Sequence, residues 1–325
     1  MTGLPLGRRG ALAAAGSLLA APALAQQGSI AWRPERPIEI LVGFAAGGAT
    51  DLDARLYARF LEPRIGGSVV VVNRPGAGGE VALAATARAR PDGHSLGTTN
   101  MPGLLTIPIE RTAQYRLDDL APIGNLVTDP SAISVHADSP WRTLPDLLED
   151  ARRRPEAISF ASPGIGTDDH LQLVLVQQAT GARLNHVVFQ GDAPIRTAIL
   201  GRQVDSTGLN LGFVLATPDG FRILSQGGAR RSRFAPAIPT LRELGIPVEM
   251  ASERGLVMPA GTPPGVVARF REATESVARD PDFVRALEAR FVEPLWEPGE
   301  AWWARLRSQE EGYRNLWRAT PWSHR

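Results

Sequence analysis

Short apolar runs alternate with segments of helical spacing along the first third of the chain. The runs at residues 38–42 and 69–72 are continuous, as in strands buried on both faces of a sheet. Between them, Leu52, Leu56 and Phe60 recur every four residues, which predicts a helix ending at a pair of glycines. This alternation predicts an α/β fold with parallel strands.

The same alternation continues along the rest of the chain, with a turn-rich stretch at residues 225–247. Thr143 is the expected N-cap of one helix, and Asp192 that of another. We expect further strands at residues 95–99, 132–135, 158–161, 186–189, 204–209 and 255–259. We expect further helices at residues 82–89, 144–153, 171–178, from 192, and at 263–279, 282–288 and 300–317.

Two loops share one layout, in which a strand leads through a glycine turn and a Thr-Asp pair into a helix. They lie at residues 44–51 and 162–170. Glycine lets the main chain take left-handed dihedrals and approach a bound group closely. The free N–H groups of a helix start, aided by the helix dipole, favour an anion. The pattern predicts two anion-binding loops that face each other across a cleft.

Composition narrows the possible chemistry. The 325 residues, with 43% hydrophobic and 21% charged content, are typical of a soluble globular protein of two domains. The sequence has no cysteine, and all of its 35 basic residues are arginine. These absences exclude disulfides, thiolate chemistry, lysine Schiff bases and a Walker-type phosphate loop. A carboxylate is therefore a better expected anion than a nucleotide phosphate.

The first residues are typical of an export signal. Arg8 and Arg9 precede an apolar run at residues 11–21. Small residues then form the expected signal-peptidase cleavage site before Gln26. We expect residues 1–25 to direct export to the periplasm, by the Sec or the twin-arginine route. Their removal takes away two arginines, so the formal charge of +1 becomes −1. The remaining charge does not indicate binding to nucleic acid. No later apolar segment is long enough to cross a membrane.

Other kinds of site are weighed against binding. A metal site could be formed by Asp168, Asp169, His170 and His186, since Asp and His are both zinc ligands. However, side chains at adjacent positions of a helix start point in different directions. We therefore expect no metal and no cofactor. The main alternative is an exported enzyme, either a hydrolase or nucleotide-dependent. The sequence has no Gly-x-Ser-x-Gly motif, and Val81 stands where a dinucleotide fingerprint needs a small residue.

Three tryptophans, Trp302, Trp303 and Trp317, fall in the last expected helix. We expect them to pack that helix against the fold, since aromatic side chains bury large areas. The alternative is a contact surface for a membrane partner.

Taken together, collinear blocks of the sequence resemble one family. The blocks lie at residues 36–38, 44–51, 73–79, 91–94, 161–171, 201–205, 238–240 and 259–263. Asn-Arg-Pro-Gly-Ala-Gly-Gly at 73–79 and Pro-Ala-Gly-Thr-Pro at 259–263 are the most specific. The chain resembles the periplasmic solute receptors of tripartite tricarboxylate transporters, also called Bug receptors.

That resemblance implies a two-domain type II periplasmic binding-protein fold, with mixed, mostly parallel sheets and a ligand cleft between the domains. We expect domain 1 at residues 36–134 and 251–325, and domain 2 at 135–250. It implies an extracytoplasmic receptor, not an enzyme. We expect it to be a monomer that captures a small carboxylate for a membrane transporter or a sensor.

The resemblance also implies which residues meet the ligand, mostly through main-chain N–H groups. The candidates are Ala46, Gly47, Gly48 and Asp51 in the first loop, Ser162, Gly164, Thr167, Asp168 and His170 in the second, and Gly191, Asp192 and Asn210 on the far wall.

One departure from the family concerns Asp168 and Asp169, which stand where the family often has small polar residues. Two carboxylates beside an anion site raise the electrostatic cost of binding a dianion. Two interpretations remain open. In the first, the two carboxylates stabilise the helix N-terminus, and each contributes about 0.3 to 1 kcal/mol to stability. In the second, one of them contacts an amine or amide of the ligand.

Overall fold

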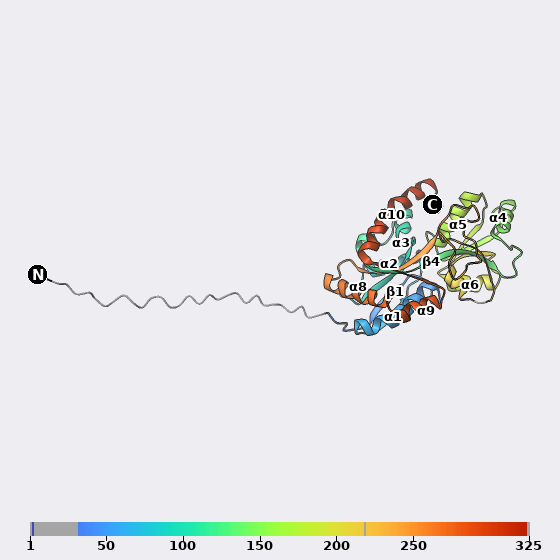
Figure 1. Ribbon diagram of the computed structural model, residues 1–325. Helices are drawn as coiled ribbons and strands as arrows, with labels where there is room; N and C mark the ends of the chain where they lie inside the picture. The colour runs from blue at the N-terminus through green and yellow to red at the C-terminus, as the bar shows by residue number, and fades with distance from the viewer. Residues whose placement is uncertain (1, 3–31, 218, 324–325) are drawn as a thin grey trace. The chain divides into compact units, whose positions relative to one another are not determined.

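The computed structural model describes residues 2, 32–217 and 219–323 (Figure 1). The expected export signal at residues 1–25 therefore lies, apart from Thr2, outside the described residues. Among the helices that the structure describes, none is both long and apolar enough to cross a membrane.

Residues 32–323 are built around a ten-stranded sheet in the order β2-β1-β3-β9-β4-β7-β5-β6, with β8 and β10 also paired to β4. The first half of the sheet contains β1 (Ile38–Val42), β2 (Val69–Asn73), β3 (Ser95–Met101), β9 (Ala251–Pro259) and β10 (Glu293–Pro298). The second half contains β5 (Ser159–Ser162), β6 (Asn185–Val188), β7 (Ser206–Asn210) and β8 (Phe221–Gln226). The β1, β2 and β3 pairs and the β5, β6 and β7 pairs are parallel, whereas all pairs of β4 are antiparallel.

Strand β4 (Leu120–His136) joins the two halves. Residues 120–130 pair with β9, and residues 131–135 pair with β7. The sequence predicted only 132–135 as strand, because proline, glycine and aspartate interrupt the apolar pattern before it. Two register shifts in the β9 pairing absorb these interruptions.

Helices cover both halves. The first half carries α1 (Ala49–Ile65), α2 (Glu80–Ala87), α3 (Gly103–Glu110), α8 (Pro264–Ala278), α9 (Pro281–Glu288) and α10 (Gly299–Ala319). The second half carries α4 (Leu144–Arg153), α5 (Asp168–Thr180), α6 (Asp192–Leu200) and α7 (Leu211–Leu215). Every predicted strand and helix has a counterpart; α3, α7, β8 and β10 were not predicted.

Each half has its own large hydrophobic core. One contains side chains of β1, α1 and α8, among them Ile40, Leu61 and Phe270. Another contains side chains of α4, β5 and α5, among them Leu147 and Phe160. The division at residues 134/135 and 250/251 stays a prediction.

Helix α1 shows where four-residue spacing was misleading. It ends at Gly66, in the left-handed conformation, as predicted. Leu52, the first residue of the predicted four-residue pattern, is 37% exposed. Leu56 of the same pattern is buried, as are Asp53, Tyr57 and Leu61. Sequence spacing cannot show that Asp53 has a buried cationic partner, which is described below.

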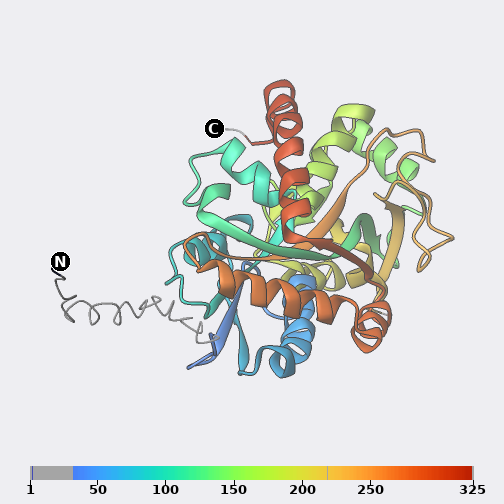
Figure 2. The same ribbon diagram turned by 60° about the vertical axis from the view of Figure 1, so that its left-hand side comes forward.

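Helix α10 separates the three tryptophans that the sequence groups together. Trp302 and Trp303 pack in a core with α3, with ring centroids 5.6 Å apart. Trp317 lies against Trp322, 4.7 Å between centroids, beside Leu171 of α5. Packing is thus their observed role, and the end of α10 packs next to α5 (Figure 2).

Candidate ligand-binding site

The first loop, between β1 and α1, is held in place by Asp51. Gly47 has a φ of +80° and donates its N–H to the carboxylate of Asp51 at 2.8 Å. Asn73 donates to the same carboxylate at 2.8 Å, and Arg55 forms an ion pair with it. Burial acts to raise the pKa of Asp51, but these hydrogen bonds outweigh it and lower the pKa. Asp51 is therefore an ionised group that fixes the shape of the loop.

The second loop, between β5 and α5, closes on itself in a similar way. Thr167 is the N-cap of α5, and its hydroxyl accepts from the N–H of His170. Gly166, at φ +80°, donates its N–H to Nδ1 of His170 at 3.1 Å. Oγ of Ser162 lies 2.7 Å from Nε2 of His186. The side chains of Ser162 and His170 thus hold the loop in place through hydrogen bonds.

The two loops belong to different halves of the sheet, and each contacts a segment of the opposite half. The N–H of Ala45 donates to the carbonyl of Gln190 at 2.8 Å. A side-chain carbon placed on Gly164 would lie 2.7 Å from Cα of Gly78. A cavity of about 400 Å³ lies at this junction, lined by Gly43, Gly76, Ala77, Gly78, Arg111, Pro163, Gly164, Ile165, Val188, Phe189 and Gln190.

Asp192 does not cap its own helix, so that prediction is wrong. The N-cap of α6 is Gly191, and no side chain caps it. The Oδ2 atom of Asp192 instead accepts from the N–H of Ala49 at 2.8 Å, in the first turn of α1. The reason is geometric, because the first N–H groups of α1 lack partners within their own helix. A carboxylate of the second half thus occupies the α1 end of the first loop.

Arg254 of β9 is a buried cation that the sequence did not single out. It forms ion pairs with Asp53 at 2.7 Å and Asp129 at 3.1 Å. It also donates to Oδ1 of Asn210 at 2.6 Å. Burial acts to lower the pKa of Arg254, but the surrounding carboxylates outweigh it and raise the pKa. Arg254 therefore links α1, β4 and β7 around one charge.

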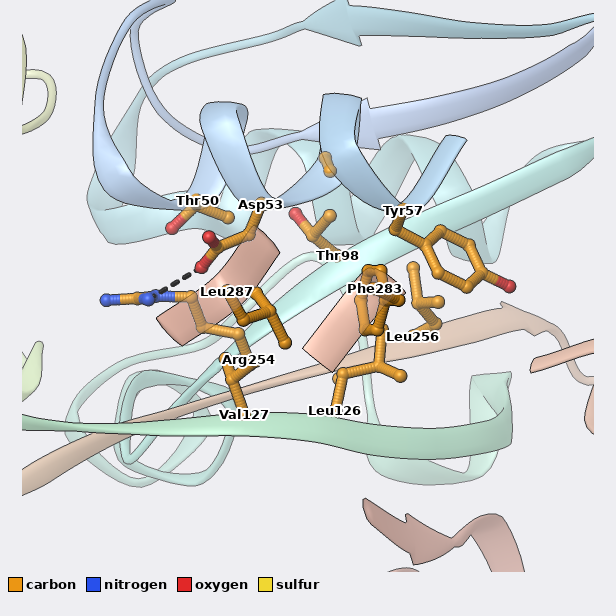
Figure 3. Close-up of a pocket in the computed structure, with 12 residues that line it drawn as sticks. Thr50, Asp53, Tyr57, Thr98, Leu126, Val127, Arg254, Leu256, Phe283 and Leu287 are labelled. Atoms are coloured by element: carbon orange, nitrogen blue, oxygen red, sulfur yellow. Dashed lines mark hydrogen bonds and ion pairs between the residues drawn. The ribbon is translucent and has the colours of Figure 1, made fainter. Parts of the chain in front are cut away.

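Figure 3 shows the ion pair of Asp53 and Arg254 beside a mostly apolar cavity lined by Tyr57, Phe283 and Leu287 among others. This cavity has a volume of about 20 Å³, enough for one water molecule. It is too small for a carboxylate ligand, so we place the candidate site at the loops instead.

Asp168 and Asn210 of the predicted site contact each other at 2.7 Å, with Nδ2 of Asn210 donating. The hydroxyl of Ser131 donates to the same Oδ2 atom of Asp168 at 2.6 Å. Burial raises the pKa of Asp168 despite these hydrogen bonds. Burial also raises the pKa of Asp129 to about 7, although Arg254 lies beside it. Burial therefore opposes ionisation of both Asp129 and Asp168.

Ser162 and His186 have the separation of a nucleophile and its base. Ser162 is fully buried, and among the described residues no carboxylate contacts His186 through a hydrogen bond or ion pair. The rings of His170 and His186 stack 4.2 Å apart, and burial lowers their pKa values to about 3 and about 4. Both rings are therefore neutral. No cluster of three metal-ligating side chains occurs in the part of the chain that the structure describes.

The predicted site residues thus lie around the junction of the two halves, but most are buried. Ala46 is exposed and Gly47 half-buried. Gly164 alone among them lines the junction cavity. The sequence missed the cavity residues Gly76, Gly78 and Arg111, although the glycine-rich block at 73–79 was available as a signal. A larger cavity of about 880 Å³ lies between α5 and residues 320–323, and Ile165 and His170 of the second loop line it.

Comparisons with known proteins agree with this architecture. The profile of the tripartite tricarboxylate transporter family receptor (TctC) matches residues 54–311. A UPF0065 protein of Cupriavidus necator is 31% identical, over 89% of this chain and 88% of that protein. The structure of the periplasmic binding protein BugD is 31% identical with a TM-score of 0.82, covering 88% of this chain and 98% of that chain. The R. palustris protein Rpa4515, solved with adipate, is 26% identical with a TM-score of 0.80, covering 88% and 96%. The chain therefore has an α/β periplasmic binding-protein fold and belongs to the tripartite tricarboxylate transporter receptor family, as a non-enzymatic solute-binding receptor.

Proposed function

We propose that this receptor captures a small carboxylate between its two glycine loops. The observation that carries the proposal is the carboxylate of Asp192, which the N–H of Ala49 already binds at 2.8 Å. The start of α1 therefore accepts a carboxylate in this fold, as the free N–H groups and the dipole of a helix start favour. The adipate of Rpa4515 supports the same class of ligand.

The candidate residues then divide into three groups, apart from Asp168, which Asn210 already holds by a hydrogen bond. Main-chain groups of Ala46, Gly47, Gly48 and Gly164 are the proposed ligand contacts. Side chains that are already hydrogen-bonded hold the loops in shape, and these are Asp51, Ser162, Thr167 and His170. Gly191, Asp192 and Asn210 form the far wall, where Asp192 is the group that a ligand carboxylate displaces.

Family membership supports delivery of the ligand to a membrane transporter, with a sensor as the alternative acceptor. We propose that the export signal places the receptor in the periplasm. Ligand binding would favour one arrangement of the two halves in proportion to its affinity for that arrangement over others. The transporter or sensor would then bind one of these arrangements in preference to the other.

A thermal-shift screen tests the proposal. Mono-, di- and tricarboxylates, amino acids and aromatic acids are compared with sodium chloride at equal ionic strength. A carboxylate at 100 times its Kd is expected to add about 2.7 kcal/mol to the free energy of unfolding. A screen in which no acid raises the melting temperature above the salt control contradicts the proposed function.

A further inference from the structure

Thr106 of α3 uses its hydroxyl differently from several other threonines inside helices. A common partner of a helical threonine hydroxyl is the carbonyl four residues earlier in the same helix. That bond is present at Thr86, Thr180, Thr197 and Thr274. The hydroxyl of Thr106 instead donates to the carbonyl of Gly166 in the second loop, at 2.5 Å. A bond between the two halves of the protein thus replaces the local one.

The second loop lies close against α3 and against the glycine block at residues 76–79. A side-chain carbon on Gly166 would lie 3.1 Å from the hydroxyl oxygen of Thr106, and one on Gly164 would lie 2.7 Å from Cα of Gly78. Glycine permits this close approach of one backbone to another. We call these four residues the α3 contact, in which Thr106 and Gly78 of the first half lie against Gly164 and Gly166 of the second.

A separate contact joins the two halves at the first loop. There the N–H of Ala45 donates to the carbonyl of Gln190 at 2.8 Å. The cavity of about 400 Å³ is lined by Gly78 and Gly164 of the α3 contact and by Gln190 of the other contact. Both contacts therefore border the cavity, and separation of the halves would open it.

We propose that Thr106 is a positioning residue that holds the two halves together around this cavity. Its hydroxyl reaches Gly166 only while the second loop lies against α3, so the bond stabilises this arrangement over those in which the halves separate. A buried carbonyl that loses its donor is unfavourable, so removal of the hydroxyl favours separation. Entry and release of a ligand would both become faster. This consequence for the ligand rests on the proposed function, whereas the contact between the halves does not.

Hydrogen exchange of the full mature chain without added ligand tests the inference. The segment to follow is residues 44–50, because the N–H groups of Ala45 and Ala49 bond to the opposite half. In Thr106→Val, which keeps the shape and removes the hydroxyl, we expect this segment to exchange about tenfold faster. Thr106→Ser keeps the hydroxyl and should exchange as slowly as the unmodified chain. Residues 57–65 of α1 should not change, since their helix lies within the first half.

Thr86→Val is the matched control, because Thr86 is 0% exposed, like Thr106, but bonds within α2. It should leave exchange at residues 44–50 unchanged. Unchanged exchange in Thr106→Val overturns the inference, and so does equal acceleration in the two valine variants. Rapid exchange of this segment in the unmodified chain overturns it as well, because the halves are then not held together. Should Thr106→Val not fold, Thr106→Ala carries the same test.

Stopped-flow kinetics with adipate separate this inference from the proposed function. Entry and release both require the halves to separate, so Thr106→Val should raise both rate constants about tenfold and change Kd by less than about twofold. Equal rate constants in the unmodified chain and Thr106→Val overturn the inference and leave the proposed function intact. If adipate does not bind, hydrogen exchange alone decides the inference. The proposed function is contradicted only when the other acids of the screen fail as well.

Discussion

The carboxylate of Asp192 accepts a hydrogen bond at 2.8 Å from the N–H of Ala49, which lies 143 residues earlier in the chain. A side chain from the start of α6 therefore caps the start of α1. The receptor carries, within its own structure, an example of the carboxylate that the α1 end of the first loop can hold.

Removal of that carboxylate should strengthen ligand binding. In Asp192→Ala the ligand carboxylate no longer competes with Asp192 for the N–H of Ala49. The variant also removes a carboxylate that would repel the ligand. We expect the affinity for a carboxylate found by thermal-shift screening to rise about tenfold, measured by calorimetry. Asp192→Asn, which keeps an acceptor without the charge, should give a smaller gain. Weaker binding in Asp192→Ala would show that Asp192 clamps the two halves together instead.

Asp51 should matter for both stability and binding. In Asp51→Ala the N–H of Gly47 and the amide of Asn73 lose a buried acceptor. A buried donor without a partner costs about 1 to 3 kcal/mol, so urea unfolding should show a loss in that range. The thermal shift with a binding acid should fall with it. A variant of native stability and native affinity would contradict the role of Asp51 in fixing the loop.

Arg254 is expected to be the most costly side chain of the region to remove. Among the described residues, Arg254→Met leaves Asp53 with only Arg290 and Asp129 with no cationic partner. Breaking a buried ion pair in this way typically costs about 3 to 5 kcal/mol. Urea unfolding measures the loss.

A matched control for Arg254 is Arg318→Met, because Arg318 pairs with Glu311 on the surface. Exposed pairs contribute about 0 to 1 kcal/mol. Equal losses in the two arginine variants would contradict the account of Arg254.

His186 gives a pH dependence with a definite sign. Burial lowers its pKa from the ordinary 6.5 to about 4. Between these values the unfolded chain binds a proton on His186 and the folded chain does not, so the contribution of His186 to the free energy of unfolding falls as the pH drops from 6.5 to 4. The stability of the unmodified chain minus that of His186→Gln should therefore shrink, by about 3 kcal/mol. A constant difference across that range would contradict a neutral buried ring.

Much of the fold was accessible from the sequence because local patterns determine it. The capping box of Thr143 and Asp146 marks the start of α4, and the structure shows both of its hydrogen bonds. Gly66 ends α1 for an equally local reason. Strand β4 was found only in part, because its residues 120–130 are held by pairing with β9, which is distant in sequence.

The interior of the candidate site was less accessible, because its contacts join residues far apart in the chain. Asp53 is buried owing to Arg254, which lies 201 residues later. Asp192 has the pattern of an N-cap in its own segment, yet the structure directs it to another helix. Local propensity describes most of the segments but carries no information about which segments meet.

The most direct test of the central claim is calorimetry of an acid found by the screen, on the unmodified chain, Gly48→Val and Gly312→Val. A side-chain carbon on Gly48 would lie 3.1 Å from Oδ2 of Asp192, so valine fills the place at the start of α1 that a carboxylate needs. Gly312 lies in α10 with no atom near its added carbon and serves as the control. We expect Gly48→Val to lose measurable binding while it stays folded, and Gly312→Val to bind like the unmodified chain. Unchanged affinity in Gly48→Val would contradict the claim that the glycine loops hold the ligand carboxylate.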